Sequence, residues 1–260
     1  MRESLDREAL HEALVTSGSP WTAVDVHPTL GSTNAEAARL AEPWRVVLTD
    51  HQQAGRGRLG RTWETPAQTS VTMSVLVPAP DDGRGWMPLL TGLAVMRGIG
   101  DVTGLDAGLK WPNDVLLPAD DERKVCGVLC ELQPGGIVVG LGINVDQDRD
   151  ELPVDTATSL RLAGATDVDR EDLVVAVLGH LAGLHGDLVQ GGPARRAAQA
   201  AYRDACLTLG REVDLHESSG AVRRVRAVGI DADGRLVVTA GGPVYAVAAG
   251  DVVHARATGG

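Results

Sequence analysis

The sequence is poor in several residue types, and each shortage excludes something. Its 260 residues contain three cysteines, Cys126, Cys130 and Cys206, too few for a disulfide framework. We therefore expect a reducing compartment, the cytoplasm. No apolar run approaches the roughly 20 residues that span a membrane, and the segment MRESLDREALHEALV is charged and amphipathic, unlike a secretory signal. The sequence thus predicts no membrane association.

Positive charge is scarce as well. The net charge of −11 argues against general affinity for nucleic acid, which needs a basic surface. The 24 basic residues include only two lysines, Lys110 and Lys124, and the chain has only three asparagines, Asn34, Asn113 and Asn144. A lysine that acts as a compact point charge cannot be replaced by arginine, whose guanidinium has a different shape. The two lysines are therefore candidate functional residues.

The most basic stretch is HQQAGRGRLGRTWETP at residues 51–66. Its glycines let the backbone approach a ligand, and Arg56, Arg58 and Arg61 supply forked donors that match phosphate or carboxylate oxygens. It is no Walker A motif, because it lacks GK[ST], and no strand–turn–helix context makes it a dinucleotide fingerprint. Alone, the loop could also be a solvated basic turn or an RGG-like segment that binds nucleic acid.

KWPND (110–114) carries a second group of candidates. Pro112 restricts Trp111 to extended geometry. Asn113 offers donors and an acceptor that suit a base edge or a phosphate, and Asp114 could bind a cation or orient Lys110. The alternative is an ordinary turn at the end of a strand.

Two predicted strands supply the remaining candidates. Strict alternation along KVCGVLCEL (124–132) puts Lys124, Cys126, Val128 and Cys130 on one face and Val125, Gly127, Leu129 and Glu131 on the other. The two cysteines lack nearby His or Cys partners, so we expect small buried hydrophobes rather than zinc ligands. In GLGINV (140–145), Gly140 and Gly142 permit close approach of a ligand, or simply tight packing, just before Asn144.

Periodicity predicts helices alternating with strands. We expect helices over 1–16, 32–42, 86–100, 170–189 and 193–207, and strands over 44–50, 70–78, 109–117, 124–132 and 136–145. Thr33 and Glu36 have the spacing of a capping box, and the acidic stretch 146–156 reads as a loop. Short strands over 211–217, 221–230, 234–240, 243–249 and 251–255, with a hairpin turn at 231–234, predict a small β barrel.

Together these segments resemble the biotin–protein ligases. The resemblance rests on STN (32–34), QQAGRGRLGRTW (52–63), KWPND (110–114), KVCGVL (124–129) and GLGINV (140–145), in that order and spacing. It implies an α+β fold, in which a mixed or antiparallel sheet packed with helices forms a class II synthetase-like catalytic domain. That domain is expected over 1–208 and an SH3-like domain over 209–260. Only 31 residues precede STN, too few for the winged helix-turn-helix of the repressor members, so we expect the monofunctional type.

The resemblance also implies an activity. Biotin and MgATP would give biotinyl-5′-AMP and pyrophosphate, and a lysine on a biotin carboxyl carrier domain would then take the biotinyl group and release AMP. The implied partners are biotin, ATP with Mg²⁺, and the acceptor domain, without nucleic acid or membrane. The rival readings are a lipoate–protein ligase, a catalytically silent biotin sensor, and a nucleic-acid-binding protein that uses the Arg-Gly loop.

Residue roles follow from the same resemblance. The residues expected to bind biotin are Ser32, Thr33, Asn34, Gln52, Arg56, Gly57, Arg58 and Lys124. Those expected to face ATP or the adenylate are Trp63, Lys110, Asn113, Asp114 and Asn144, with the 146–156 loop ordering over the adenine. Lys124 and Arg58 are the expected catalytic residues, and Asp114 is the expected Mg²⁺ ligand.

Overall fold

The structure is a computed structural model that describes residues 2–216, 221–247 and 251–254. Parts of three predicted strands, at 217, 248–249 and 255, lie outside the described residues, as do residues 256–260 of the predicted C-terminal domain.

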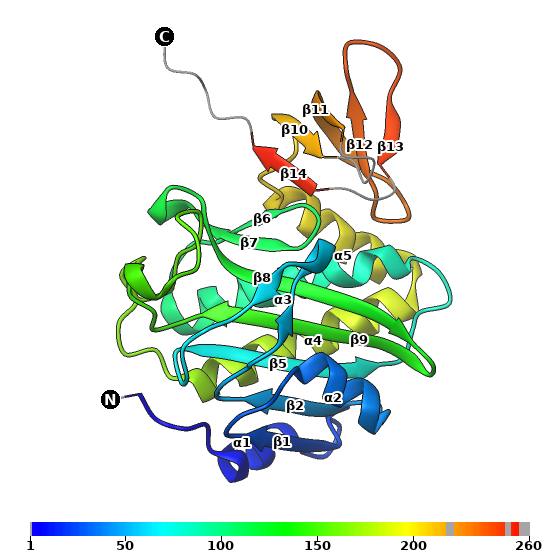
Figure 1. Cartoon of the computed structure of the whole chain (residues 1–260). Helices are drawn as coiled ribbons and strands as arrows, with labels where there is room; N and C mark the ends of the chain where they lie inside the picture. Colours follow the sequence, from blue (N-terminus) through cyan, green and yellow to red (C-terminus); the bar gives the residue numbers. More distant parts are fainter. Residues whose placement is uncertain (1, 217–220, 248–250, 255–260) are drawn as a thin grey trace.

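A seven-stranded sheet forms the centre of the molecule (Figure 1). Its order is β1 (Ala23–His27), β2 (Arg45–Thr49), β5 (Ser70–Val77), β9 (Gly136–Asn144), β8 (Arg123–Gln133), β7 (Asp114–Leu117) and β6 (Gly108–Lys110). β1 and β2 are parallel, and the other neighbouring pairs are antiparallel. The mixed sheet is confirmed, as are the predicted strands that became β2, β5, β8 and β9. β1 was not predicted, since five residues carry little periodicity.

The single strand predicted over 109–117 is wrong. β6 and β7 are separate antiparallel strands, and residues 111–113 turn the chain between them with a cis Trp111–Pro112 peptide bond. Proline has no N–H to donate and a fixed φ, so it cannot continue a central ladder. The turn brings Lys110 opposite Asp114 in the register.

The five predicted helices are confirmed, with shifted ends. They are α1 (Arg7–Leu14), α2 (Thr33–Leu40), α3 (Met87–Thr103), α4 (Arg170–Gln190) and α5 (Gly192–Ala205). The described part of the chain also has four short 3₁₀ turns, η1 (Arg58–Gly60), η2 (Arg84–Trp86), η3 (Pro118–Asp120) and η4 (Arg149–Glu151). The predicted cap at Thr33 is wrong, because Ser32 is the N-cap of α2 and accepts a hydrogen bond from the backbone N–H of Ala35.

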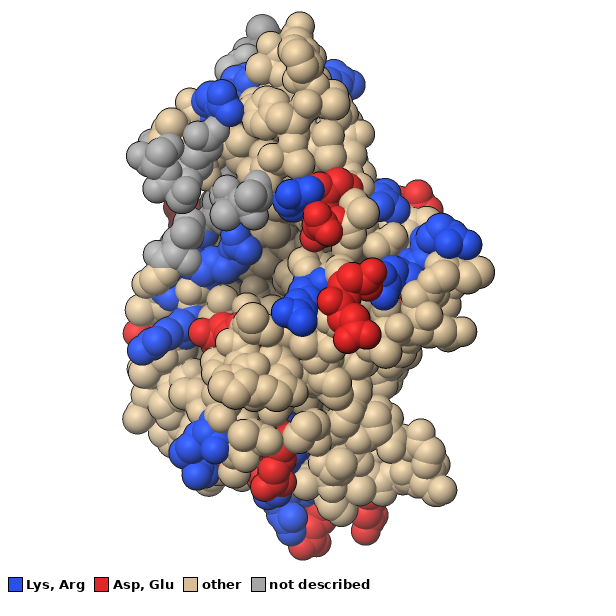
Figure 2. Space-filling view, turned by 90° about the vertical axis from the view of Figure 1, so that its right-hand side faces the viewer, with Lys and Arg blue, Asp and Glu red and all other residues tan. Residues whose placement is uncertain are grey.

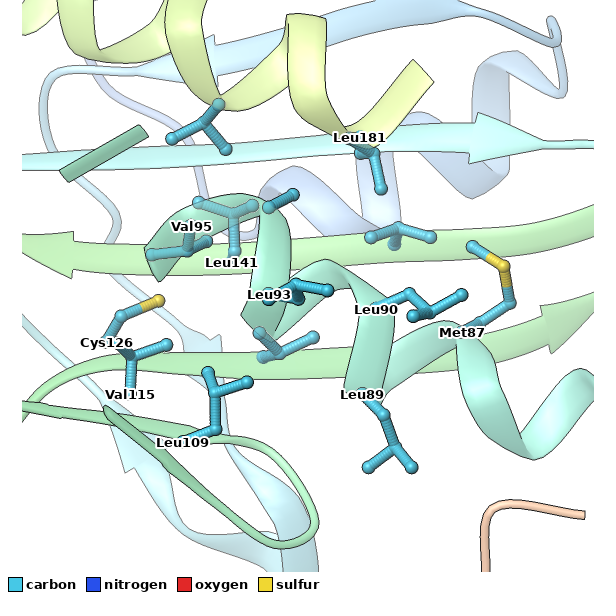
Figure 3. Close-up of a cluster of buried hydrophobic side chains, with 14 of the residues drawn as sticks. Met87, Leu89, Leu90, Leu93, Val95, Leu109, Val115, Cys126, Leu141 and Leu181 are labelled. Atoms are coloured by element: carbon cyan, nitrogen blue, oxygen red, sulfur yellow. The ribbon is translucent and has the colours of Figure 1, made fainter. Parts of the chain in front are cut away.

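Helices cover the two faces of the sheet unequally. α2 packs on one face, where Ala37 meets Val47, Leu76 and Val138. α3 and α4 cover the other face, where Leu89, Leu90 and Leu93 of α3 lie in one cluster with Leu109, Val115, Cys126 and Leu141 of the strands (Figure 3). The larger core therefore lies between the sheet and helices α3 and α4, and the face of the sheet that carries α2 remains available for a site.

α4 is the one helix among the described residues long and apolar enough, by length and composition, to cross a membrane. It packs against α3 with nine buried residues, as the core helix of a globular protein does. At one contact Gly98 of α3 lies against Val177, with no room for a Cβ atom.

A second sheet follows the helices, in the order β13 (Tyr245–Val247), β12 (Leu236–Thr239), β11 (Val222–Ile230), β10 (Glu212–His216) and β14 (Asp251–His254). All its pairs are antiparallel, consistent with the predicted SH3-like domain, and the hairpin at 231–234 is confirmed. Two indoles from outside this sheet bond to its 231–234 hairpin: Trp86 Nε1 donates to the Ala232 carbonyl (2.9 Å), and Trp111 Nε1 donates to the Gly234 carbonyl (3.0 Å). The predicted boundary at 208/209 stays a prediction.

Candidate functional site

A cleft of about 1540 Å³ opens on the α2 face of the main sheet. Every residue predicted for the site lines it: Ser32, Thr33, Asn34, Gln52, Arg56, Gly57, Arg58, Trp63, Lys110, Asn113, Asp114, Lys124 and Asn144. Arg211, Val253 and His254, from the region of the second sheet, also line the cleft. The structure thus brings together side chains that are up to 112 positions apart in the predicted set.

The floor of the cleft is made by residues with little or no side chain. Gly142 of β9 and Gly127 of β8 lie beneath the Trp63 indole, and a Cβ atom on Gly142 would be 2.5 Å from Trp63 Nε1. Gly140 is in contact with Asn34 in the same way. The predicted close approach at the glycines is therefore confirmed, with protein side chains as the groups that approach.

The basic loop folds over this floor as a small two-stranded ribbon, β3 (Gly55–Arg56) with β4 (Thr62–Trp63). Gly55 has no space for a Cβ atom, because Gln52 and the Trp63 carbonyl crowd it. The loop is thus a flap over the floor, with Trp63 turned inward. Arg56 is exposed, whereas Arg58 and Trp63 are half-buried.

One end of the cleft holds a polar network around the start of α2. Gln52 Oε1 accepts from the backbone N–H of Thr33 (2.8 Å) and from its hydroxyl (3.2 Å). Ser74 Oγ lies 2.7 Å from Thr33 Oγ1 and 2.6 Å from Asn34 Oδ1. Asn34 Nδ2 donates to Glu131 Oε2 (2.6 Å). This network fixes Thr33, Asn34 and Gln52 against the sheet.

The centre of the cleft holds both lysines around one carboxylate. Lys124 Nζ lies 2.6 Å from Asp114 Oδ1, and Lys110 Nζ lies 3.7 Å from Oδ2. Burial lowers the pKa of the Lys110 ammonium, with Asp114 opposing the shift and Lys124 adding to it. Burial also lowers the pKa of the Arg58 guanidinium. One carboxylate cannot neutralise two ammonium groups, so this region favours an anionic ligand.

The alternation predicted along β8 holds from Cys126 to Glu131, with Gly127, Leu129 and Glu131 lining the cleft, but it is wrong at Lys124 and Val125. The register runs from Val115 opposite Cys126 directly to Leu116 opposite Lys124, so Val125 is an extra residue in a β-bulge. The bulge puts Lys124 on the same side as Gly127, whose Cβ would lie 2.9 Å from Nζ. Cys126 instead faces the core, where burial raises the pKa of its thiol to about 12, confirming that it is a buried hydrophobe.

Two of the predicted asparagines have their side chains committed to the walls of the cleft. Asn113 Nδ2 donates to the Val128 carbonyl (2.9 Å) and so holds the β6–β7 turn against β8. Asn144 Nδ2 donates to the Thr158 carbonyl (2.9 Å), and its Oδ1 accepts from Gln147 (3.3 Å). Both residues shape the site, whatever else they contact.

The acidic segment after β9 is fastened to Lys124 through the backbone. The Lys124 N–H donates to the Thr156 carbonyl (2.9 Å), and the Thr158 N–H donates to the Lys124 carbonyl (2.8 Å). Asp120 adds bonds from Arg149 (2.9 Å) and from the Thr158 hydroxyl (2.5 Å). The segment is thus one wall of the cleft and the backbone support of Lys124.

The described residues hold no group of three His, Cys, Asp or Glu side chains placed to bind a metal ion. Asp114, the predicted Mg²⁺ ligand, has a lysine beside each of its oxygens. This donor set does not fit a metal held by the protein.

Ser74 and Glu131 are site residues that the sequence reasoning missed. The alternation of Ser70, Thr72 and Ser74 with apolar residues in β5 is a signal that could have identified Ser74, because it marks a strand with one polar face. Glu131 was predicted on the face of Gly127, but only the bulge in β8 brings Lys124 to that same face. Figure 2 shows Lys and Arg beside Asp and Glu over one face of the molecule, so the surface charge on that face is of both signs.

Comparisons with known proteins agree with this geometry. Residues 30–148 match the family model described as "Biotin/lipoate A/B protein ligase family", and residues 208–255 match "Biotin protein ligase C terminal domain". The chain is 37% identical over 267 residues to the biotin–[acetyl-CoA-carboxylase] ligase of Mycobacterium tuberculosis, covering 98% of each chain. The chain belongs to the biotin protein ligase family.

Other biotin protein ligases match over different lengths. A bifunctional ligase/repressor of Bacillus subtilis is 33% identical over 166 residues, which cover 58% of this chain and 50% of that protein. Among solved structures, the biotin protein ligase from Aquifex aeolicus in complex with biotin and ATP superposes with a TM-score of 0.77 at 27% identity. That match covers 90% of this chain and 99% of the other.

Proposed function

We propose that this biotin protein ligase uses ATP to activate biotin and transfers the biotinyl group to a lysine of a biotin carboxyl carrier domain. The observation that carries the proposal is the pair of lysines around Asp114 at the centre of a large cleft in an acidic protein. The relatives support it: one is named a biotin–[acetyl-CoA-carboxylase] ligase, and another was solved with biotin and ATP.

In the first step a carboxylate oxygen of biotin attacks the α-phosphorus of ATP. The bond from that phosphorus to the bridging oxygen breaks, and pyrophosphate leaves. Because both reactants are anions, the site must supply positive charge and exclude water. We assign the first task to Lys124, Lys110 and Arg58, and the second to the 55–63 flap with Trp63.

In the second step the neutral amine of the acceptor lysine attacks the acyl carbon of biotinyl-5′-AMP. The acyl–oxygen bond breaks, AMP leaves, and the nitrogen loses a proton as the amide forms. Lys124 is placed to stabilise charge on the departing phosphate as well. Water competes with the amine, so an ordered flap protects the anhydride until the acceptor arrives.

We place biotin at the end of the cleft that carries Ser32, Thr33, Asn34 and Gln52, and ATP toward the β6–β7 turn and Asn144. Mg²⁺ would enter as MgATP, held by phosphate oxygens, since it is commonly bound with few protein ligands. We propose the cytoplasm as the compartment.

The test is release of pyrophosphate from MgATP on addition of biotin, with lipoate and no acid as controls. The proposal requires release with biotin, and incorporation of biotin into an acceptor domain afterwards. Release with lipoate alone would replace biotin by lipoate as the substrate. Binding of biotin without release would leave a sensor in place of an enzyme.

A further inference from the structure

The segment 146–157 forms a wall of the cleft and supports the Lys124 backbone, so whatever holds this segment also positions the site. Its end lines the cleft through Pro153, Val154, Thr156 and Ala157. Its beginning, Asp146 to Glu151, carries four acidic residues and one arginine, Arg149. The four carboxylates of this turn repel one another, so cations that bind the turn stabilise it.

Arg2 supplies such a cation from the other end of the chain. Its Nε lies 3.0 Å from Asp146 Oδ2, and one terminal nitrogen lies 2.8 Å from the Asp146 carbonyl and 2.7 Å from Glu151 Oε2. The other terminal nitrogen lies 2.8 Å from Glu151 Oε1. A single guanidinium thus bridges the two ends of the turn with the forked geometry that a lysine cannot provide.

The segment that carries Arg2 is itself anchored to the body. Arg170, at the start of α4, donates to the carbonyls of Glu3 and Ser70 and pairs with Asp50 (3.0 Å). Asp50 also accepts from the backbone N–H of Leu5 (3.3 Å). The Asp50 and Arg170 side chains are only 4% and 9% exposed, so this is an interior pair.

The electrostatics agree with a persistent contact. The hydrogen bond from Arg2 is the largest cause that lowers the pKa of Glu151, to about 2, so this carboxylate stays charged at neutral pH. Arg161 holds the same turn from the opposite side, 3.0 Å from Asp146 Oδ1.

We propose that Arg2 is a positioning residue for adenylation: it clamps the 146–151 turn and thereby holds the 153–157 wall and the Lys124 backbone in the conformation that binds ATP. The inference rests on the proposed function for its kinetic part only. In the proposed function ATP lies toward Asn144 and this wall, so binding of MgATP should depend on the clamp more than binding of biotin, which also draws on Ser32, Thr33 and Asn34.

The variant Arg2→Ala tests the clamp, with Arg7→Ala as matched control. Arg7 lies on the same N-terminal segment and is exposed. Its ion pair is local and long, 3.8 Å to the neighbouring Glu8. Hydrogen exchange of the free protein should accelerate at the amides of Lys124 and Thr158 in Arg2→Ala, and stay unchanged at Val139 in the core strand β9. This readout needs no activity.

The kinetic readout is the Michaelis constant for each substrate. Arg2→Ala should raise KM for MgATP by roughly three- to tenfold, with a smaller change for biotin and kcat. Arg2→Lys keeps the charge and should show a smaller increase in KM for MgATP than Arg2→Ala. Combined with Glu151→Gln, Arg2→Ala should add little further effect, because both changes remove the same contact.

Unchanged exchange at Lys124 and Thr158 would overturn the proposal, and so would acceleration spread evenly over β9, which indicates general destabilisation. Equal increases in KM for biotin and MgATP would also overturn it. Absence of pyrophosphate release by the unaltered protein would instead remove the proposed function and the kinetic part, while the exchange result would still decide whether Arg2 holds the wall.

Discussion

At the scale of single residues, Lys124 is held at both ends. Asp114 fixes its ammonium at 2.6 Å, and residues 156 and 158 fix its backbone. A side chain constrained in this way loses little freedom when a ligand arrives. An incoming anion only has to share the ammonium with Asp114, which keeps the group in place before and after binding.

Replacement of Lys124 by Ala should slow biotin-dependent pyrophosphate release by roughly ten- to a hundredfold, since a charge-assisted contact contributes about 1.5–3 kcal/mol. The variant should fold, because Lys124 is partly exposed and outside the core. Lys124→Arg retains the charge in another shape, so its rate of pyrophosphate release should lie between those of the unaltered protein and Lys124→Ala. Release near the unaltered rate in Lys124→Ala would refute the assigned role.

The glycine floor gives a second prediction at this scale. Gly142→Ala places a methyl group 2.5 Å from the Trp63 indole, so the ring must move. We expect ligand-induced thermal stabilisation by biotin with ATP to be lost while the fold remains. Gly179→Ala in α4, where no atom lies within 4 Å, is the control and should gain about 0.5–1 kcal/mol in unfolding free energy. Undiminished thermal stabilisation of Gly142→Ala by the ligands would contradict the role of Gly142 in the floor of the ligand site.

At the scale of elements, α4 is joined to the sheet through a buried histidine. His185 Nε2 donates to the Pro78 carbonyl (2.8 Å), and its ring stands edge-on to Trp44 at 4.9 Å between centroids. Burial lowers the pKa of the His185 imidazole. The neutral form is therefore the one that the folded protein accommodates.

The consequence for stability has a definite sign. The folded pKa of His185 lies below its unfolded value of about 6.5, so its contribution is complete above that value and is lost as the pH falls below it. His185→Gln should reduce the loss of unfolding free energy between about pH 7.5 and about pH 5, measured by urea titration. An identical pH profile in His185→Gln would contradict the assignment.

The same scale shows what the sequence could specify. Periodicity located α3 and α4 and the strands β5 and β9, because each is long enough for its apolar face to recur. It failed at β6–β7, where one proline divides an apolar run, and at Val125, where the bulge is visible only against the partner strand. The motifs collected the right residues for the cleft, yet the bonds from Lys124 to residues 156 and 158 follow from backbone geometry that no motif records.

At the scale of the whole molecule, two indoles and an ion pair join the sheets. Besides the bonds of Trp86 and Trp111, Arg211 forms two 2.7 Å bonds with Glu122 at the rim of the cleft. The pKa of Glu122 is lowered, first by the hydrogen bond from Arg211. The second sheet is therefore attached close to the lysines.

The double variant Trp86→Phe, Trp111→Phe keeps an aromatic ring at each position but removes the indole N–H and part of the ring volume, which leaves two carbonyls of the 231–234 hairpin without these donors. Each loss should cost about 1–3 kcal/mol. Amide exchange should accelerate in β11 more than in β9, because the second sheet opens separately. Tyr245→Phe removes a bond to Arg223 within the second sheet and is the control. Equal acceleration in both sheets would argue against a distinct joint.

Val253 and His254 line the same cleft as Ser32 and Thr33. Chains are made from the amino end, and early segments fold while later ones are still being added. A ribosome that has produced the lysines, the flap and the acidic wall has not yet produced the last side of the cleft. The nascent protein therefore carries an incomplete site while residues 158–254 are being added, and the cleft is complete only after Val253 and His254 have left the ribosome.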